Sequence, residues 1–208
     1  VHGSSSFIEY HQGKINPLTL TNDRKNFRRA NFFLPVSNYA SSFIKEQLDI
    51  PDNIVEVIYN PIDSVFFNKK NTKQVSIQSI LFIGKITEEK GAFSLIKAFN
   101  KIADQYENIK LIMIGGGDLK KGRSLVQKRY NNRVEFTGYL DRKIIATQID
   151  KCTFAVVPSY YETFGMVAIE IMSRGKALIY TRKSAGLEII EDKINGLLVD
   201  PKDIDEIC

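Results

Sequence analysis

The most informative part of the sequence covers residues 153–175 and reads TFAVVPSYYETFGMVAIEIMSRG. Its first five residues are mostly apolar, as in a buried strand, and Pro, Ser and Gly then lead into an apolar pattern with helical spacing. The stretch therefore predicts a strand, a loop and the start of a helix. The first N–H groups of a helix lack partners and carry a partial positive charge. We expect the amides of Thr163, Phe164 and Gly165 to face a site for an oxyanion.

Two carboxylates flank this predicted helix start. Glu162 lies in the loop, and Glu170 lies about two turns into the helix, roughly 10 Å further along an ideal axis. One ligand would then reach both side chains. The alternative is structural: Glu170 pairs with Arg174 on a solvated face, and Glu162 caps the helix. The stretch alone leaves both interpretations open.

Downstream of residue 79, apolar strands alternate with helical patterns. This alternation predicts an α/β fold with a Rossmann-like, doubly wound parallel sheet. The expected strands are 80–83, 109–114, 133–137, 153–157, 177–180 and 196–199. The expected helices are 92–106, 119–130, 142–150, 164–174 and 185–191.

Glycine and polar residues directly follow five of the predicted strands. In parallel sheets, ligands bind beyond the carboxyl ends of the strands. We therefore expect these loops to open on one edge and to form a single binding cleft. The loops are 84–85, 115–118, Gly138, 158–162 and 181–186.

Upstream of the predicted sheet, residues 3–22 have a loop composition. Residues 23–29 predict a short helix with four cations on one face, either a solvated face or a dock for an anionic acceptor or a phospholipid surface. Residues 31–36 and 54–59 read as strands around a helix at 38–48, for which Ser37 is the N-cap. Residues 68–79 look like a linker.

The composition is that of a globular protein with one or two domains: 208 residues, 43% hydrophobic and 25% charged. The net charge of +5 suits an anionic ligand or an acidic membrane surface. Basic runs interleaved with aromatics are absent from the sequence, so nucleic acid is not an expected partner. Cys152 and Cys208 are not spaced as a metal-binding pair, which fits a reducing cytoplasm. The sequence shows no signal peptide and no apolar run of the ~20 residues that span a bilayer.

Pro158-Ser159, Glu162, Phe164-Gly165 and Glu170 resemble the signature of glycosyltransferase family 4, whose members are retaining enzymes with the two-domain GT-B fold. The resemblance implies that Glu162 and the amides after it hold the sugar and phosphate of the donor. It also implies that Glu170 binds the ribose hydroxyls.

Other loops extend this resemblance. The family usually has Arg and Lys where this chain has Lys85 and Lys90, and both reach the donor phosphates; Lys85 keeps the charge but not the bidentate fork. Lysines that are simply solvated are the alternative. Gly84, in the same loop as the two lysines, is a further donor-binding candidate. Gly116 and Gly138 are candidates because a glycine-rich turn and the segment beside the nucleobase fall there in the family. Residues 184–188 resemble its Gly-x-x-Glu stretch.

The N-terminal residues complete the resemblance. Val1-His2-Gly3 resembles a junction at which the family's catalytic His faces the donor, so His2 joins Glu162 as a catalytic candidate. Val36-Ser37 and Asn60-Pro61-Ile62-Asp63 match family features in order, although Pro61 replaces the usual Gly. The chain has no initial Met and looks cut from a longer one. We expect residues 1–65 to be the end of an acceptor-side domain and 75–208 the donor-binding domain.

The sequence predicts a hexosyltransferase that moves a sugar from a nucleoside diphosphate sugar, of UDP or GDP, to a hydroxyl of a glycan or lipid-linked acceptor with retention. Capsule, lipopolysaccharide or other glycan synthesis is the expected setting, in the cytoplasm or peripherally at the inner face of the membrane. No cofactor or metal is expected, because lysines, amides and a helix dipole would stabilise the departing diphosphate. Alternatives are another GT-B enzyme, such as an epimerase, and a non-catalytic nucleotide-binding or membrane-docking module. The 208 residues alone are expected to bind donor but to transfer little sugar.

Overall fold

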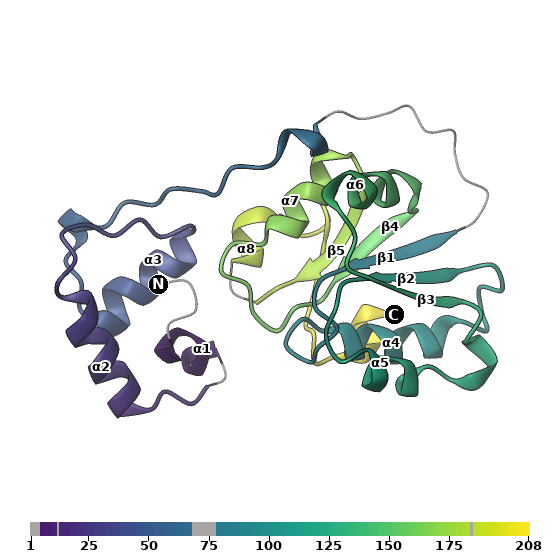
Figure 1. The fold of residues 1–208 in the computed structure, drawn as a ribbon, viewed down its shortest axis with the longest axis horizontal. Helices are drawn as coiled ribbons and strands as arrows, with labels where there is room; N and C mark the ends of the chain where they lie inside the picture. The colour runs from purple at the N-terminus through teal and green to yellow at the C-terminus, as the bar shows by residue number, and fades with distance from the viewer. Residues whose placement is uncertain (1–4, 12, 68–77, 184) are drawn as a thin grey trace.

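A six-stranded parallel sheet organises the larger part of the molecule (Figure 1). The computed structural model describes residues 5–11, 13–67, 78–183 and 185–208. The strand order is β3-β2-β1-β4-β5-β6, and every neighbouring pair is parallel. This confirms the predicted Rossmann-like sheet. The strands are β1 Ser79–Ile83, β2 Lys110–Ile114, β3 Val134–Gly138, β4 Phe154–Val157, β5 Ala177–Thr181 and β6 Leu197–Val199.

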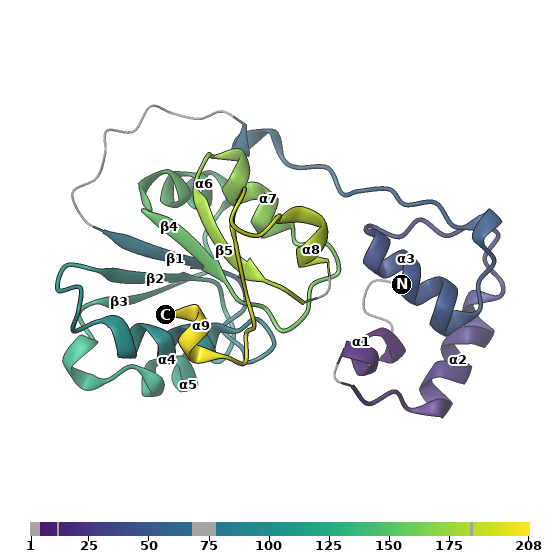
Figure 2. The same ribbon diagram turned by 180° about the vertical axis from the view of Figure 1, so that it is seen from behind.

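Helices cover both faces of the sheet (Figures 1 and 2). One face packs against α4 Ala92–Ile102, α5 Leu119–Leu125 and α9 Ile204–Ile207; the other packs against α6 Arg142–Lys151, α7 Met166–Ser173 and α8 Gly186–Ile189. The central strand serves both layers, because Ile80 and Phe82 belong to the first core and Leu81 and Ile83 to the second. Such two-sided burial explains the continuous apolar run in β1.

Two predicted helices in this part end at least four residues earlier than expected. The helix predicted over 92–106 ends at Ile102, and the one predicted over 119–130 stops at Leu125 before a separate turn, η3 Lys128–Tyr130. Asn100 accounts for the second break. Its side chain donates to the carbonyl of Leu125 (2.8 Å) and accepts from the N–H of Gln127 (3.2 Å), so both groups are satisfied outside a helix.

The prediction of a loop over residues 3–22 is wrong, because two helices lie there: α1 Ser5–His11 and most of α2 Pro17–Phe27. Asn16 caps α2 by accepting from Leu18 N (2.9 Å), and Pro17 suits a first helical position. Helix α1 is held by tertiary contacts, since Ser6 Oγ donates to Asp23 (2.5 Å) and Phe7 is buried.

The predicted basic helix over residues 23–29 forms the end of α2 but is shorter than expected. Helix α2 ends at Phe27, so Arg28 and Arg29 lie in a turn beyond it. Arg24 is tied to α3 Asn38–Leu48 and its end, because Nε donates to the carbonyl of Gln47 (2.9 Å) and Nη2 pairs with Asp49 (3.2 Å).

The strands predicted at 31–36 and 54–59 are reduced to one parallel bridge between Phe33 and Val55. Three backbone hydrogen bonds join the two segments, including Ile58 N to Pro35 O at 2.9 Å. Pro35 has no N–H to continue the ladder, and no third strand pairs with them among the described residues. The predicted helix between them is confirmed as α3, with Ser37 as its N-cap.

The chain packs around separate centres. We call residues 5–59 the helical unit; its core contains Phe7, Phe33, Phe43, Ile44, Leu48 and Ile50. We call residues 62–67 and 78–208 the sheet unit. An extended segment joins the units in Figure 1, and η2 Ser64–Phe66 then buries Phe66 in the core beneath α6 and α7. Most of the linker predicted at 68–79 lies outside the described residues. In the part of the chain that is described, no helix is long and apolar enough to cross a membrane.

Candidate functional site

A hollow of about 240 Å³ lies at the carboxyl edge of the sheet. The end of β1, the loop before α4 and the loop from β4 to α7 form it, as the parallel topology requires. It brings together Gly84, Lys90, Glu162, Thr163, Phe164 and Gly165, six of the predicted site residues. Asn60, Ile83, Met166 and Val167 complete its lining.

At the start of α7, a row of backbone N–H groups in this hollow has no hydrogen-bond acceptor among the described residues. The backbone N–H groups of residues 163–167 donate to no group in the described part of the chain. Gly165 is the N-cap and provides no side-chain cap. These N–H groups and the positive end of the helix are a ready site for an anion.

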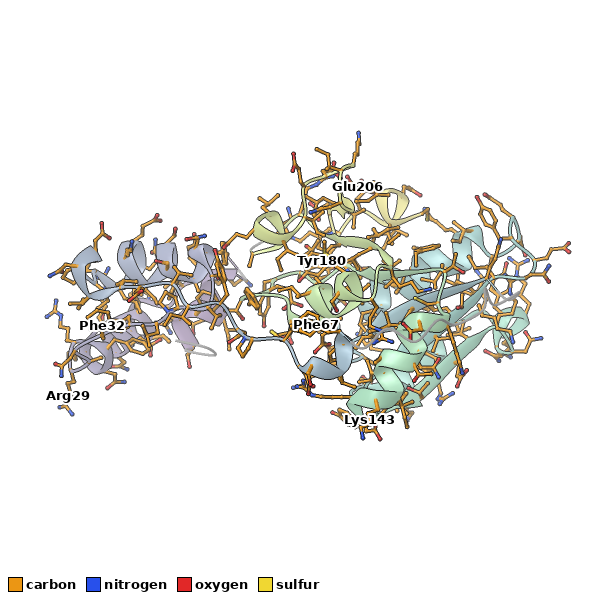
Figure 3. All side chains as sticks on the ribbon, turned by 90° about the horizontal axis from the view of Figure 1, so that it is seen from above. Arg29, Phe32, Phe67, Lys143, Tyr180 and Glu206 are labelled. Carbon is orange, nitrogen blue, oxygen red and sulfur yellow. The ribbon has the colours of Figure 1, made fainter. Side chains whose placement is uncertain are left out.

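Gly165 cannot be replaced here without strain. Its φ is +95°, in the region that favours glycine, and a Cβ at this position would lie 2.2 Å from Tyr180 Oη. The Tyr180 side chain, labelled in Figure 3, is fully buried in the sheet unit, and its hydroxyl has no hydrogen-bond partner among the described residues. Burial first, and then the nearby Glu162, raise the pKa of Tyr180 well above 10.0.

Glu162 is fixed in the hollow by two donors. Its Oε1 accepts from Lys90 Nζ at 2.9 Å and from Ser159 Oγ at 2.8 Å. Ser159 is fully buried and the Glu162 side chain is 15% exposed. The carboxylate therefore does not cap α7, and the structural alternative for this residue is wrong. Lys90 compensates its charge and also lines the hollow.

Glu170 is buried, with 8% of its surface exposed, and it makes no hydrogen bond or ion pair with its carboxylate in the described part of the chain. It lies three residues after Val167, on the same side of α7 as that lining residue. Burial is the main cause of a raised pKa for Glu170; Arg142 acts to lower this pKa and Asp63 to raise it.

Arg174 does not pair with Glu170, so the structural alternative for that carboxylate is also wrong. Arg174 is 2% exposed rather than on a solvated face. Its Nε donates to Asp150 at 2.8 Å, its Nη2 donates to the second oxygen of Asp150, and its Nη1 donates to the carbonyl of Val65 at 3.1 Å.

Three of the other predicted residues lie on adjoining loops rather than in the hollow. Lys85 is exposed. Gly116 accepts from Ile86 N (2.8 Å), and Gly138 accepts from Gly115 N (2.9 Å), so the loops after β1, β2 and β3 are bonded to one another.

The remaining predictions concern the catalytic His and a metal. His2 lies outside the described residues. Asp203 caps α9 by accepting from Asp205 N (2.9 Å) and Glu206 N (3.1 Å). Among the residues that the structure describes, no cluster of three or more His, Cys, Asp or Glu side chains is placed to hold a metal.

The structure adds contacts that sequence reasoning missed. Ser37 Oγ donates to the carbonyl of Thr163 at 2.5 Å, and the ring of Tyr59 stacks on Phe164 with centroids 5.7 Å apart. In the sequence, Ser159 belongs to the motif around Glu162, and Ser37 is a predicted helix cap that also matches a family feature. The motif was thus a signal for Ser159, whereas a contact between residues 126 positions apart leaves none.

Nearly all of the sheet unit matches a known protein family. The sequence profile described as "Glycosyl transferases group 1" matches residues 64–208, more than half of the chain. The chain belongs to this family. The profile starts where η2 begins, and it includes all of the hollow except Asn60.

Individual proteins with a similar sequence are also named as glycosyltransferases. The chain is 30% identical over 186 residues to the uncharacterized glycosyltransferase MJ1607 of Methanocaldococcus jannaschii, covering 81% of the chain and 47% of the relative. It is 26% identical over 149 residues to the 2-deoxystreptamine N-acetyl-D-glucosaminyltransferase of Niallia circulans, covering 71% of the chain and 38% of the relative. The chain spans about half the length of the first of these relatives and less of the second.

Solved structures show the same fold. Anabaena Alr3699/HepE, solved with UDP and glucose, matches with a TM-score of 0.79 at 22% identity, covering 91% of this chain and 55% of that one. Sucrose-phosphate synthase from Thermosynechococcus elongatus matches with a TM-score of 0.80 at 23% identity, covering 97% and 54%. Over about half of their length, the chain thus shares the predicted GT-B type of α/β fold with these structures.

Proposed function

We propose that the hollow at the start of α7 binds the diphosphate and sugar of a nucleotide sugar, and that the protein transfers this sugar to an acceptor hydroxyl with retention. The observation that carries the proposal is the row of free N–H groups over residues 163–167, beside Lys90 and Glu162. A diphosphate gains negative charge as the bond to the sugar breaks. Preorganised amides and a lysine at that place stabilise the transition state more than the ground state.

Each site residue then has a role in the proposal. The amides after Glu162 hold the departing diphosphate, and Lys90 adds positive charge while it positions Glu162. Glu162 faces the donor sugar, Glu170 binds the ribose, and Gly84, Gly116 and Gly138 allow close approach to the backbone. Lys85 reaches the phosphates from its exposed place. His2 keeps its proposed catalytic role. No metal is required for this charge stabilisation.

The donor and its setting are also part of the proposal. UDP and GDP sugars are the candidates, supported by the UDP and glucose in the Anabaena structure. The proposed acceptor is a glycan or a lipid-linked glycan, the proposed setting is the cytoplasm or the inner face of a membrane, and the proposed reaction is hexosyl transfer in capsule, lipopolysaccharide or other glycan synthesis. By themselves, the 208 residues are proposed to bind donor and to transfer little sugar.

Calorimetry of the chain with UDP and with GDP, in the presence of a chelator, tests the proposal. We expect one of them to bind, and Lys90→Ala to weaken binding by about 1.5–3 kcal/mol, the usual contribution of a hydrogen bond to a charged group. Lys101→Ala is the matched control, because Lys101 pairs with Asp205 at 2.6 Å on the exposed surface of α4 and α9. No heat with either nucleotide at millimolar concentration, from folded protein, would overturn the proposal.

A further inference from the structure

The first turn of α3, in the helical unit, meets the donor loop of the sheet unit through a buried serine. Ser37 has no exposed surface. Its Oγ accepts from Ala40 N at 3.0 Å, as an N-cap does, and donates its own hydrogen to the carbonyl of Thr163 at 2.5 Å. The second bond is not needed to cap the helix, and it reaches one of the residues that line the hollow.

The hydrogen bond to Thr163 sets the direction of one backbone N–H group in the hollow. The peptide group between Thr163 and Phe164 is planar and trans, so its C=O and N–H point in opposite directions. A carbonyl held toward Ser37 therefore turns the N–H of Phe164 away from α3. That N–H is one of the free donors over residues 163–167.

Glu188 of α8 makes a contact in the opposite direction, from the sheet unit to the first turn of α3. Its carboxylate accepts from the backbone N–H groups of Asn38 (2.9 Å) and Tyr39 (2.6 Å), where a negative charge also interacts favourably with the helix dipole. Together with Ser37, it satisfies the first three N–H groups of α3. Figures 1 and 2 both show α8 on the side of the sheet unit that faces the helical unit.

An aromatic pair supports the same loop from a second direction. Tyr59 stacks on Phe164, and its hydroxyl accepts from Asn38 Nδ2 at 3.0 Å. The peptide between Thr163 and Phe164 is therefore held on its carbonyl and on the following ring, in both cases by groups from the helical unit.

We propose that Ser37 and Glu188 are positioning residues for the donor site. Glu188 holds the first turn of α3, this turn holds Ser37, and Ser37 orients the peptide that directs the N–H of Phe164 into the anion site. The inference rests on the proposed function for its effect on nucleotide binding, while its effect on the loop stands apart from any ligand.

Amide ¹⁵N relaxation of the 208-residue chain measures the loop directly. In wild type we expect backbone order parameters near 0.85 at residues 163–166, and in Ser37→Ala and Glu188→Ala values nearer 0.6, the level of flexible backbone. Asn16→Ala is the control for Ser37, because it removes an N-cap bond of 2.9 Å in α2. Glu191→Ala is the control for Glu188, since it removes an exposed carboxylate just after α8.

Calorimetry with the same nucleotides gives the second readout. Ser37→Ala and Glu188→Ala should each weaken binding about tenfold, whereas Asn16→Ala and Glu191→Ala should bind as wild type does. Unchanged loop order in both positioning variants would overturn the inference, whatever the nucleotide does. Because Glu188 is exposed, Glu188→Ala keeps the test informative if Ser37→Ala does not fold. Failure of wild type to bind either nucleotide would instead overturn the proposed function, and with it the coupling to binding.

Discussion

Glu170 shows, at the scale of one residue, a carboxylate whose surroundings differ from those of a structural one. A surface glutamate would be solvated and a structural buried glutamate would be paired, but this one is buried with no partner for its carboxylate among the described residues. Burial without a partner destabilises the charged form. Proteins retain such costs mainly where a ligand or a reaction uses the group.

Glu170→Gln should change stability and binding in opposite directions. The raised pKa of Glu170 means that the folded state holds its proton more tightly than the unfolded state. The favourable contribution is therefore present below the ordinary value of 4.5 and is lost as the pH rises through the raised pKa. We expect the variant to be more stable than wild type at pH 7, with the difference vanishing near pH 4, in urea unfolding curves.

Nucleotide affinity of Glu170→Gln should fall by roughly 1.5–3 kcal/mol, because the amide is a weaker partner for ribose hydroxyls than the carboxylate. Glu107→Gln, at an exposed position, is the control for both measurements. Binding equal to that of wild type would return Glu170 to a structural role.

At the scale of elements, one ion pair joins three segments. Arg174 directly follows α7, Asp150 belongs to α6, and Val65 belongs to η2. Both side chains of the pair are 3% exposed. A bidentate arginine at such a place satisfies Asp150 and also a backbone carbonyl, which an aliphatic residue would not do.

Arg174→Ala should lower the free energy of unfolding by about 3–5 kcal/mol, because it leaves Asp150 charged and without its main partner inside the protein. The double variant Arg174→Met/Asp150→Leu should recover most of the loss. Urea unfolding measures both. Arg129→Ala is the control, since its pair with Asp104 is about 60% exposed and should contribute under about 1 kcal/mol. If Arg174→Ala and Arg129→Ala lowered the free energy of unfolding equally, the buried pair would stabilise the fold no more than the exposed one.

At the scale of the whole molecule, the helical unit and the sheet unit have separate hydrophobic cores. Figure 3 labels Arg29 and Phe32 at the end of the helical unit that lies away from the sheet unit. Between the two units, the contacts of α3 and Tyr59 are mostly hydrogen bonds and one ring pair. Each unit should therefore open largely by itself.

Hydrogen exchange followed by mass spectrometry tests this independence. Phe43→Ala, in the core of the helical unit, should speed exchange in α1–α3 and leave β1 and β2 protected, because it removes a buried ring at a cost of about 3–5 kcal/mol. Phe66→Ala should do the opposite, since Phe66 packs beneath α6 and α7. Exchange that rises equally in both units for either variant would show that the chain opens as one cooperative body.

The sheet, the order of its elements and the loop of the candidate site could be predicted from the sequence. These features depend on local hydrophobic periodicity and on glycines at positions with a positive φ, which other residues rarely adopt, as at Gly165. The parallel sheet then places its loops on one edge, so Gly84, Lys90 and the residues from Glu162 to Gly165 could be grouped in advance.

The pairing of side chains, in contrast, depends on how the elements pack in three dimensions. Helical spacing makes Arg174 a possible partner of Glu170, yet Arg174 pairs with Asp150, which belongs to another helix. Helix α1 has a loop-like composition and is held by Asp23 and by the burial of Phe7. Ser37 meets Thr163 although 126 positions separate them. Spacing along a chain limits which local neighbours are within reach, whereas long-range pairs are chosen by the burial of charge and apolar surface when elements pack together.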